Sequence, residues 1–273
     1  MRKKIFSVVM AGVVLAVSGC GAIDEDKITK GNTEVAATTN KNIETTTIQE
    51  TTTPEQTTED TTKVIESVDD FDINAARVNL PDDRLLQGYD FSDAVFIGDS
   101  RTEGLTVYNV LTTSTVLATR GLMASSALTD KFVDLGNGKG TVVDYLKLHK
   151  FKKVYIMLGL NELGCLLSTY TDSYKELIDE VRQAEPDSEI YIMPVIPMVE
   201  ERTDEVYNNE IIAKFNEALK GVCTEKNVPL INVSAALVNE KGTLPSELST
   251  DGIHLNAKGL RRLVNYLILA TAN

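Results

Sequence analysis

The stretch Ala94-Val95-Phe96-Ile97-Gly98-Asp99-Ser100-Arg101-Thr102, near the middle of the chain, decides the fold. Its first four residues are apolar, as expected of a short buried strand, and the glycine and polar residues that follow indicate a turn. Ser100 therefore comes just beyond the end of a strand. A serine hydroxyl in such a position becomes a nucleophile only when a general base lies beside it, and the rest of the chain must supply that base.

Short apolar runs alternate with segments of helical periodicity in this part of the chain. The expected strands are Ala94–Ile97, Thr115–Ala118, Lys153–Leu158, Ile190–Val195 and Pro229–Asn232, and the expected helices are Thr141–His149, Asp172–Glu185, Asp204–Lys226 and Ala257–Ala270. This alternation predicts a parallel sheet that helices cover on both faces. Five strands of this kind favour a three-layer α/β fold with a flavodoxin-like, five-stranded parallel sheet.

Four separate segments should meet at one edge of this sheet. In a flavodoxin-like order, ligands bind beyond the carboxyl ends of the strands, at the switch point between the first and third strands. Ser100 follows the first strand, Gly121 the second and Asn161 the third. The turn Asp251-Gly252-Ile253-His254 follows the fifth strand, and His254 is one of only two histidines in the chain. Serine, histidine and aspartate are the three groups of a nucleophilic hydrolase, so the sequence predicts such a site here.

In this order and spacing, the motifs resemble those of the SGNH (GDSL-type) hydrolase family, across the whole domain. The resemblance implies the SGNH hydrolase fold and a serine ester hydrolase. No metal and no organic cofactor are implied. The resemblance also implies that Ser100 attacks the ester carbonyl, that His254 takes and returns the proton, and that Asp251 orients the imidazole. The backbone N–H groups of Ser100 and Gly121 and the side-chain amide of Asn161 would form the oxyanion hole.

The sequence departs from the family pattern in the loops around the serine. Glu162 follows Asn161 where the family often has aspartate, and we expect this acid to support the loop rather than the chemistry. The turn after Gly121, Leu122-Met123-Ala124-Ser125, lacks the second glycine that is often found there. Thr102 stands where the Gly-x-Ser-x-Gly elbow of the α/β-hydrolases has its second glycine, which argues against that other fold.

The N-terminal residues have the parts of a secretion signal. A basic start, Met1–Lys4, precedes an apolar stretch, Ile5–Val17, that is too short to span a bilayer comfortably. Val17-Ser18-Gly19-Cys20 then resembles a bacterial lipobox, which implies cleavage before Cys20 and diacylation of its sulfur. An ordinary signal peptide with a chance cysteine is the alternative. We expect a signal peptide at 1–19 and a mature protein that is lipid-anchored through Cys20 to the outer face of the bacterial cytoplasmic membrane.

Composition divides the remaining chain into two parts. Residues 20–70, which start with the lipidated cysteine, are rich in threonine and acidic residues and contain almost nothing that could form a core, so we expect a disordered stalk. Residues 71–273 have the length and apolar content of one domain with a sizeable core, the SGNH hydrolase domain.

Charge and cysteine content exclude several classes of function. The formal net charge is −13, and loss of the three basic residues of the signal peptide makes it −16. Such a chain is a poor candidate for binding nucleic acid or anionic lipid by charge alone. Three cysteines rule out a disulfide scaffold. With Cys20 lipidated, Cys165 and Cys223 remain as two partly buried thiols, and a bond between them is left open.

Three further features have ordinary structural interpretations. Arg101 could bind an anionic substrate group, but an exposed or salt-bridged arginine is the commoner case. His149 lies at an expected helix end, where capping and the helix dipole explain it better than catalysis does. The loop Gly136-Asn137-Gly138-Lys139-Gly140 lacks the spacing of a phosphate-binding loop and is expected to be a flexible connection.

The sequence leaves three functions to compare. The leading one is an extracytoplasmic serine esterase that hydrolyses acyl esters, with O-acetyl groups on carbohydrate as the expected substrate. The first alternative keeps the chemistry but acts on lipid, like a lysophospholipase or a thioesterase, and the segment Pro197–Tyr207 should overhang the site and shape the acyl pocket. The second is a non-catalytic surface-binding lipoprotein, against which intact Ser100, Asp251 and His254 argue.

Overall fold

The computed structural model describes residues 80–86 and 89–271. The expected signal peptide, Cys20, the stalk and the first residues of the expected domain lie outside the described residues. Within the described ranges, no helix is both long enough and apolar enough to cross a bilayer.

Four parallel strands form the central sheet, in the order β2-β1-β5-β6. They are β1 (Ala94–Gly98), β2 (Thr115–Ala118), β5 (Lys153–Met157) and β6 (Glu189–Ile192). β1 pairs in parallel with both β2 and β5, and β5 pairs in parallel with β6. This arrangement confirms the expected α/β fold and brings the carboxyl ends of the strands to one edge of the sheet.

The expectation of a fifth strand at Pro229–Asn232 is wrong. Among the described residues, only one isolated parallel bridge, between Ile192 and Leu230, extends the sheet on this side. The Ile192 N–H donates to Pro229 O at 3.0 Å, and the Ile231 N–H donates to Ile192 O at 2.8 Å. Because proline has no N–H, it cannot donate to a ladder, and the segment runs beside β6 without becoming a strand.

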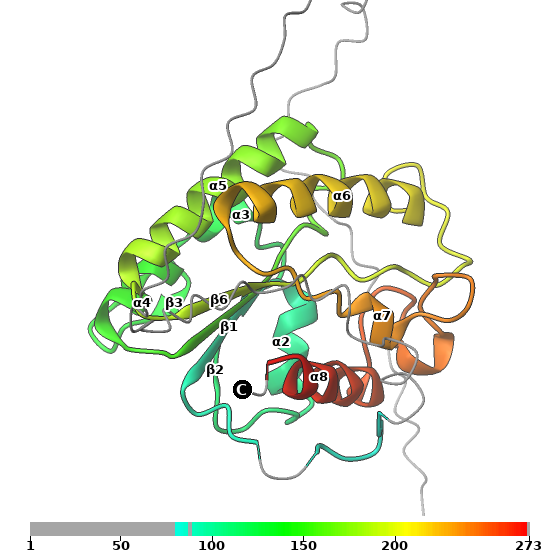
Figure 1. Cartoon of the computed structure of the whole chain (residues 1–273), viewed down its shortest axis with the longest axis horizontal. Coiled ribbons are helices and arrows are strands. Elements are labelled where there is room, and N and C mark those ends of the chain that lie inside the picture. The colour runs from blue at the N-terminus through cyan, green and yellow to red at the C-terminus, as the bar shows by residue number, and fades with distance from the viewer. Residues whose placement is uncertain (1–79, 87–88, 272–273) are drawn as a thin grey trace, which may run out of the picture. The chain divides into compact units, whose positions relative to one another are not determined.

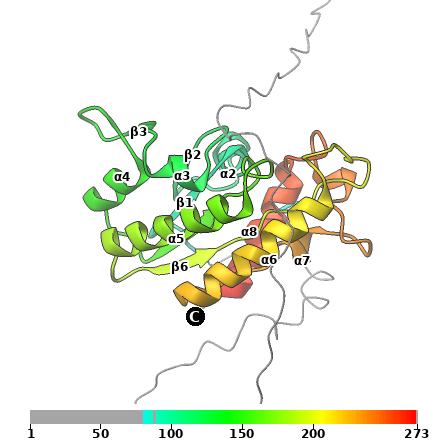
Figure 2. The ribbon, with the colours of Figure 1, turned by 90° about the horizontal axis from the view of Figure 1, so that it is seen from above.

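Helices cover both faces of the sheet and give the fold three layers (Figures 1 and 2). One face carries α3 (Ala124–Ala127), α4 (Val142–Leu148), α5 (Leu167–Ala184) and α6 (Asn209–Lys226). The other face carries α2 (Ser100–Val107), α7 (Ser234–Leu237) and α8 (Ala257–Thr271). A short hairpin, β3 (Val133–Asp134) with β4 (Lys139–Gly140), and a 3₁₀ turn, η2 (Ser246–Leu248), complete the elements described here.

The side chains of each strand alternate between two cores. In β1, Val95 and Ile97 belong to the core under α4, α5 and α6, whereas Phe96 belongs to the core under α2 and α8. Tyr155 of β5 joins Phe96 there, and the two rings stack with their centroids 4.8 Å apart. Because helices bury both faces, successive residues of these strands are apolar, which explains the continuous apolar run in the sequence.

Capping side chains decide where two of the helices begin. The Thr141 hydroxyl accepts from the Asp144 N–H at 3.1 Å, and the Asp144 carboxylate accepts from the Thr141 N–H at 3.0 Å, so a capping box starts α4. Helix α6 starts later than expected because the Asn208 side chain caps it, accepting from the Ile211 N–H at 2.9 Å. Helix α5, by contrast, starts earlier than the expected segment.

Two features with structural interpretations can now be placed. His149 ends α4, its Nδ1 lies 2.9 Å from Tyr145 O, and its ring stacks on that tyrosine, which confirms a structural role. The expectation for the loop 136–140 is only partly right. The loop closes the β3–β4 hairpin, and the Leu135 N–H donates to Gly138 O at 2.8 Å, so it is an ordered turn.

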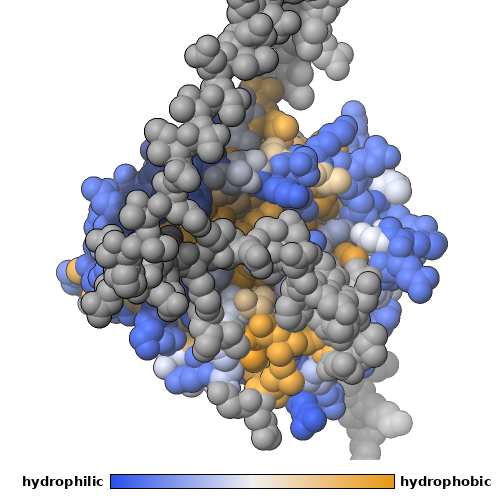
Figure 3. Space-filling view, viewed as in Figure 1, coloured by the Kyte–Doolittle hydropathy of each residue, from blue (hydrophilic) through white to orange (hydrophobic). Residues whose placement is uncertain are grey.

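Most large apolar side chains are buried, but one exposed pair lies near the carboxyl edge of the sheet. Among the described residues, the exposed large apolar side chains are Val107, Tyr108, Leu148, Leu166, Leu167 and Leu269. On the face seen in Figure 3, hydrophilic residues border a central apolar area. Leu166 and Leu167 are adjacent in the sequence and lead from the loop after β5 into α5, so they lie at the side of the fold where a site is expected.

Gly98 allows three elements to meet just before Ser100. A Cβ at this position would lie 2.0 Å from Thr102 Oγ1 in α2 and 2.7 Å from Met157 O at the end of β5. The second of these atoms belongs to the backbone and cannot move aside cheaply. Gly98 is therefore needed for its lack of a side chain, because the first turn of α2 packs directly against the ends of β1 and β5.

We predict that Gly98→Ala lowers the free energy of unfolding by at least about 2 kcal/mol, because the added methyl group overpacks this junction. Gly221→Ala is the matched control. Gly221 lies inside α6 and has no atom within 4 Å of a Cβ, so alanine there should stabilise the protein by about 0.5–1 kcal/mol. Urea unfolding measures both changes. A Gly98→Ala protein as stable as the wild type would contradict this account.

Candidate functional site

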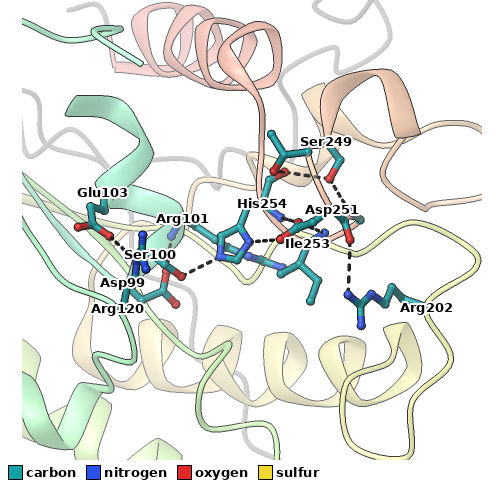
Figure 4. A network of polar contacts seen from close by, with 12 residues as sticks. Asp99, Ser100, Arg101, Glu103, Arg120, Arg202, Ser249, Asp251, Ile253 and His254 are labelled. Carbon is teal, nitrogen blue, oxygen red and sulfur yellow. Dashed lines mark hydrogen bonds and ion pairs between the residues drawn. The ribbon is translucent and has the colours of Figure 1, made fainter. Parts of the chain in front are cut away.

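Three side chains from two distant parts of the chain form one hydrogen-bonded series (Figure 4). Ser100 Oγ lies 2.9 Å from His254 Nε2, and His254 Nδ1 lies 2.7 Å from Asp251 Oδ2. A carboxylate can only accept, so Nδ1 carries the ring proton and Nε2 is the acceptor that faces the serine hydroxyl. The sequence-based prediction that these residues come together is thus met by their positions in the structure.

A tight turn holds the aspartate and the histidine in place. Asp251 Oδ1 accepts from the backbone N–H groups of Ile253 at 2.9 Å and of His254 at 2.8 Å. The Ser249 hydroxyl donates to His254 O and accepts from the Gly252 N–H, both at 2.8 Å. Gly252 has a φ of +89°, which favours glycine. Ser249 was not identified from the sequence, because nothing in a single serine before a turn indicates two such bonds.

The environment of Asp251 keeps its carboxyl group ionised. Partial burial acts to raise its pKa, but hydrogen bonds from the backbone and ring of His254 and from the Ile253 N–H outweigh burial, so the pKa is lowered. An ionised carboxylate at this position stabilises an imidazolium in His254. The side chain therefore has the charge that a partner of a histidine base requires.

Two loops beside Ser100 carry the expected oxyanion donors, and Asn161 connects them. Gly121, in the turn after β2, has a φ of +77°. The Asn161 amide, in the loop after β5, donates to Leu122 O at 3.0 Å and to Asp99 Oδ2 at 3.2 Å. The amide thus reaches both the loop of Gly121 and the residue before Ser100. All the predicted residues of the hole lie around the carboxyl end of β1.

Asp99 starts the helix that carries Ser100. It is 1% exposed, and its Oδ1 accepts from the Arg101 N–H at 2.9 Å, which caps α2. Burial raises the pKa of the Asp99 carboxyl, although the charge of Arg101 acts in the opposite direction. The position of Ser100 therefore depends on a buried carboxyl group at the start of α2.

The expectation that Arg101 is exposed or salt-bridged is wrong, because the side chain is buried and has no salt bridge among the described residues. The side chain is only 2% exposed, and its Nη1 donates to Ile196 O at 2.8 Å, while Nε and Nη2 have no partner among the described residues. Burial lowers the pKa of Arg101 to about 10, opposed by the charges of Asp99 and Asp251. Arg101 therefore ties α2 to the segment after β6 instead of facing the solvent.

Glu162 supports the loop next to Asn161, as expected from the sequence. It is 4% exposed, and its Oε1 accepts from the Ala124 N–H at 2.6 Å. The bond also explains the turn after Gly121, which keeps its place through this contact although it lacks a second glycine.

Cys223 is a free and buried thiol, and burial raises its pKa to about 12. The bond between Cys165 and Cys223 that the sequence left open is therefore absent. Cys20 lies outside the described residues.

Fold and site together define a class, the SGNH hydrolases, with a three-layer α/β fold and a serine–histidine–aspartate series at the carboxyl edge of the sheet. The chain belongs to the GDSL-like lipase/acylhydrolase family, whose model matches residues 96–262. The members of this family are described as lipases and acylhydrolases.

Two known proteins illustrate the similarity. The chain is 28% identical over 121 residues to the isoamyl acetate-hydrolyzing esterase of Saccharomyces cerevisiae, a match that covers 39% of this chain and 50% of the esterase. The chain thus spans about half the length of this curated relative. Among solved structures, a GDSL-like lipase from Bacteroides thetaiotaomicron superposes with a TM-score of 0.50 and 13% identity, covering 73% of this chain and 96% of that one. At this identity the structural match supports the fold alone.

Proposed function

We propose that the protein is a serine esterase in which Ser100 is the nucleophile. The observation that carries this proposal is the series from Ser100 Oγ through the His254 ring to Asp251, at 2.9 and 2.7 Å. His254 Nε2 takes the hydroxyl proton as Ser100 attacks the ester carbonyl carbon, and later gives the proton to the leaving alcohol. Water then attacks the carbonyl carbon of the acyl-enzyme, with His254 again taking and returning the proton, and the acid is released.

The negative oxygen of the tetrahedral intermediate needs fixed donors. In our proposal these are the backbone N–H groups of Ser100 and Gly121 and the side-chain amide of Asn161. The amide has two N–H bonds, which point to Leu122 O and to Asp99 Oδ2 in the structure. The bond to Asp99 is the longer of the two, and we propose that it yields when the amide donates to the oxyanion.

We predict that Ser100→Ala lowers kcat by about 10⁴- to 10⁶-fold without unfolding the protein, as expected for the nucleophile of such a series. Ser234→Ala is the matched control, because Ser234 is also the first residue of a helix, α7. It should keep wild-type kinetics on 4-nitrophenyl acetate. A Ser100→Ala protein that retained a tenth of the wild-type kcat would rule out the serine mechanism.

For the substrate, we propose O-acetyl groups on carbohydrate. A cavity of about 330 Å³ borders Asp251 but is not lined by Ser100 or His254. Most of its lining residues have polar side chains, namely Glu201, Arg202, Ser246, Ser249, Thr250 and Asp251. Hydroxyl and charged groups suit a sugar better than an acyl chain. The name of the yeast relative, an esterase for isoamyl acetate, also favours a short acyl group.

One observation favours the alternative of a lipid substrate. The side chains of Leu166 and Leu167 are 56% and 41% exposed, and they follow the Asn161 loop. Two neighbouring exposed leucines could take the first carbons of a long acyl chain, since each buried CH₂ contributes about 0.8 kcal/mol.

A series of 4-nitrophenyl esters separates these two substrates. If the substrate is an acetylated sugar, kcat/KM should fall between acyl chains of about two and about ten carbons, because no long apolar groove offsets the added bulk. Leu166→Ser/Leu167→Ser should leave acetate hydrolysis unchanged. A steady rise of kcat/KM with chain length, lost in the double variant, would instead establish the lipid substrate.

We propose further that the protein is anchored by lipid at Cys20 and works outside the cytoplasmic membrane. The basis is the lipobox-like sequence Val17-Ser18-Gly19-Cys20. We predict that Cys20→Ala abolishes metabolic labelling with palmitate and removes the processed protein from the membrane fraction, because diacylation of this cysteine supplies the anchor. Cys223→Ala, the control, should remain in the membrane fraction. A processed, membrane-bound Cys20→Ala protein would contradict the anchor.

A further inference from the structure

Glu162 is a buried acid that joins the two loops of the proposed oxyanion hole. It directly follows Asn161 in the loop after β5, and its Oε1 accepts from the N–H of Ala124, the first residue of α3, at 2.6 Å. Ala124 comes shortly after Gly121. This hydrogen bond and the one from the Asn161 amide to Leu122 O therefore both link the loop that carries Asn161 to the loop that carries Gly121.

The second oxygen of this carboxyl group is in an unusual position. Glu162 Oε2 is buried and has no hydrogen-bond partner among the described residues, and the same is true of the Tyr170 hydroxyl. A buried carboxylate oxygen without a donor is costly, whereas a protonated oxygen carries its own hydrogen and no net charge. The surroundings thus favour the acid form over the anion.

The titratable groups that act on Glu162 add to this preference. Asp99 faces it from the start of α2, Tyr170 and Tyr174 from α5, and Tyr207 from the segment before α6, while α3 contributes the Ala124 N–H. None of these four side chains is a cation. Burial raises the pKa of Glu162 to about 7, the Ala124 N–H opposes this, and the charge of Asp99 reinforces it.

We propose that Glu162 is a positioning residue that holds the oxyanion hole together as a neutral carboxylic acid, and that loss of its proton impairs the hole. The inference rests on the proposed serine mechanism. In that mechanism a full negative charge develops on the substrate oxygen beside Asn161. An anion at the next residue, in a buried setting, opposes that charge and also repels the carboxylate of Asp99, which accepts from the Asn161 amide.

The sign of the pH dependence follows from this arrangement. Protonated Glu162 supports the hole, so its contribution to kcat is complete below its pKa and is lost as the pH rises through about 7. His254 must be neutral to act as the base, which sets a separate limit on the acid side. Because Asp99 and Glu162 interact, the alkaline decline belongs to the pair.

The test is the pH profile of kcat and KM for 4-nitrophenyl acetate with the full chain, corrected for hydrolysis without enzyme. Glu162→Gln keeps an acceptor for Ala124 and cannot ionise, so it should retain wild-type kcat at low pH and lose the alkaline decline. Glu162→Ala removes the link, and kcat should fall on the order of 10²-fold with little change in KM. Glu185→Gln is the control, because Glu185 is also buried and accepts a backbone N–H, from Phe151, at the far end of α5.

Each outcome either supports or contradicts the positioning role of Glu162. An alkaline decline in Glu162→Gln like that of the wild type and of Glu185→Gln would overturn the proposal, as would Glu162→Gln being as impaired as Glu162→Ala at every pH. If Glu162→Ala does not fold, the profile of Glu162→Gln still decides. Ser100→Ala is measured in parallel. An active Ser100→Ala protein would refute the serine mechanism itself. An inactive Ser100→Ala protein, together with a Glu162→Gln pH profile like that of the wild type, would refute only the role of Glu162.

Discussion

The carboxyl group of Asp99 connects the segments that build the site. One oxygen caps α2 by accepting from the Arg101 N–H, and the other accepts from the Asn161 amide. Through the first bond the helix starts at Ser100 and not later, since the first N–H groups of a helix need acceptors from outside it. Through the second bond the loop after β5 stays beside the serine. A buried carboxyl group is costly, and the raised pKa of Asp99 reflects that cost.

Four strands of the sheet could be predicted because the signals that mark each strand lie within the strand itself. Runs of apolar, often β-branched residues gave β1, β2, β5 and β6 with small errors at the ends. The segment at Pro229–Asn232 has the same composition, yet whether it forms a strand depends on donors to a neighbouring strand, and proline supplies none. The start of α6 likewise depends on the cap at Asn208 and not on the apolar pattern.

The residues of the site also fall into those that the sequence could predict and those that it could not. The meeting of Ser100, Asp251 and His254 could be predicted, because a serine hydrolase needs these residue types and one histidine had a suitable position in the sequence. The burial of Arg101 and of Glu162 could not, because both side chains usually face the solvent, and only the packed loops show otherwise. For Glu162 the sequence offered one clue, its position after Asn161. That clue indicated support for a loop but gave no information about the charge of the group.

Three acidic side chains around Ser100 illustrate how the fold assigns different states to one chemical group. Asp251 receives two backbone N–H bonds and the histidine proton, so it stays ionised. Asp99 and Glu162 are buried, and burial moves both toward the neutral form. In the proposed mechanism, a negative charge beside His254 stabilises the imidazolium, whereas a negative charge beside the oxyanion opposes formation of that oxyanion. In that mechanism Asp251, which accepts the most hydrogen bonds, is next to the imidazolium of His254. Glu162, which has an unpaired oxygen, is next to the proposed oxyanion hole.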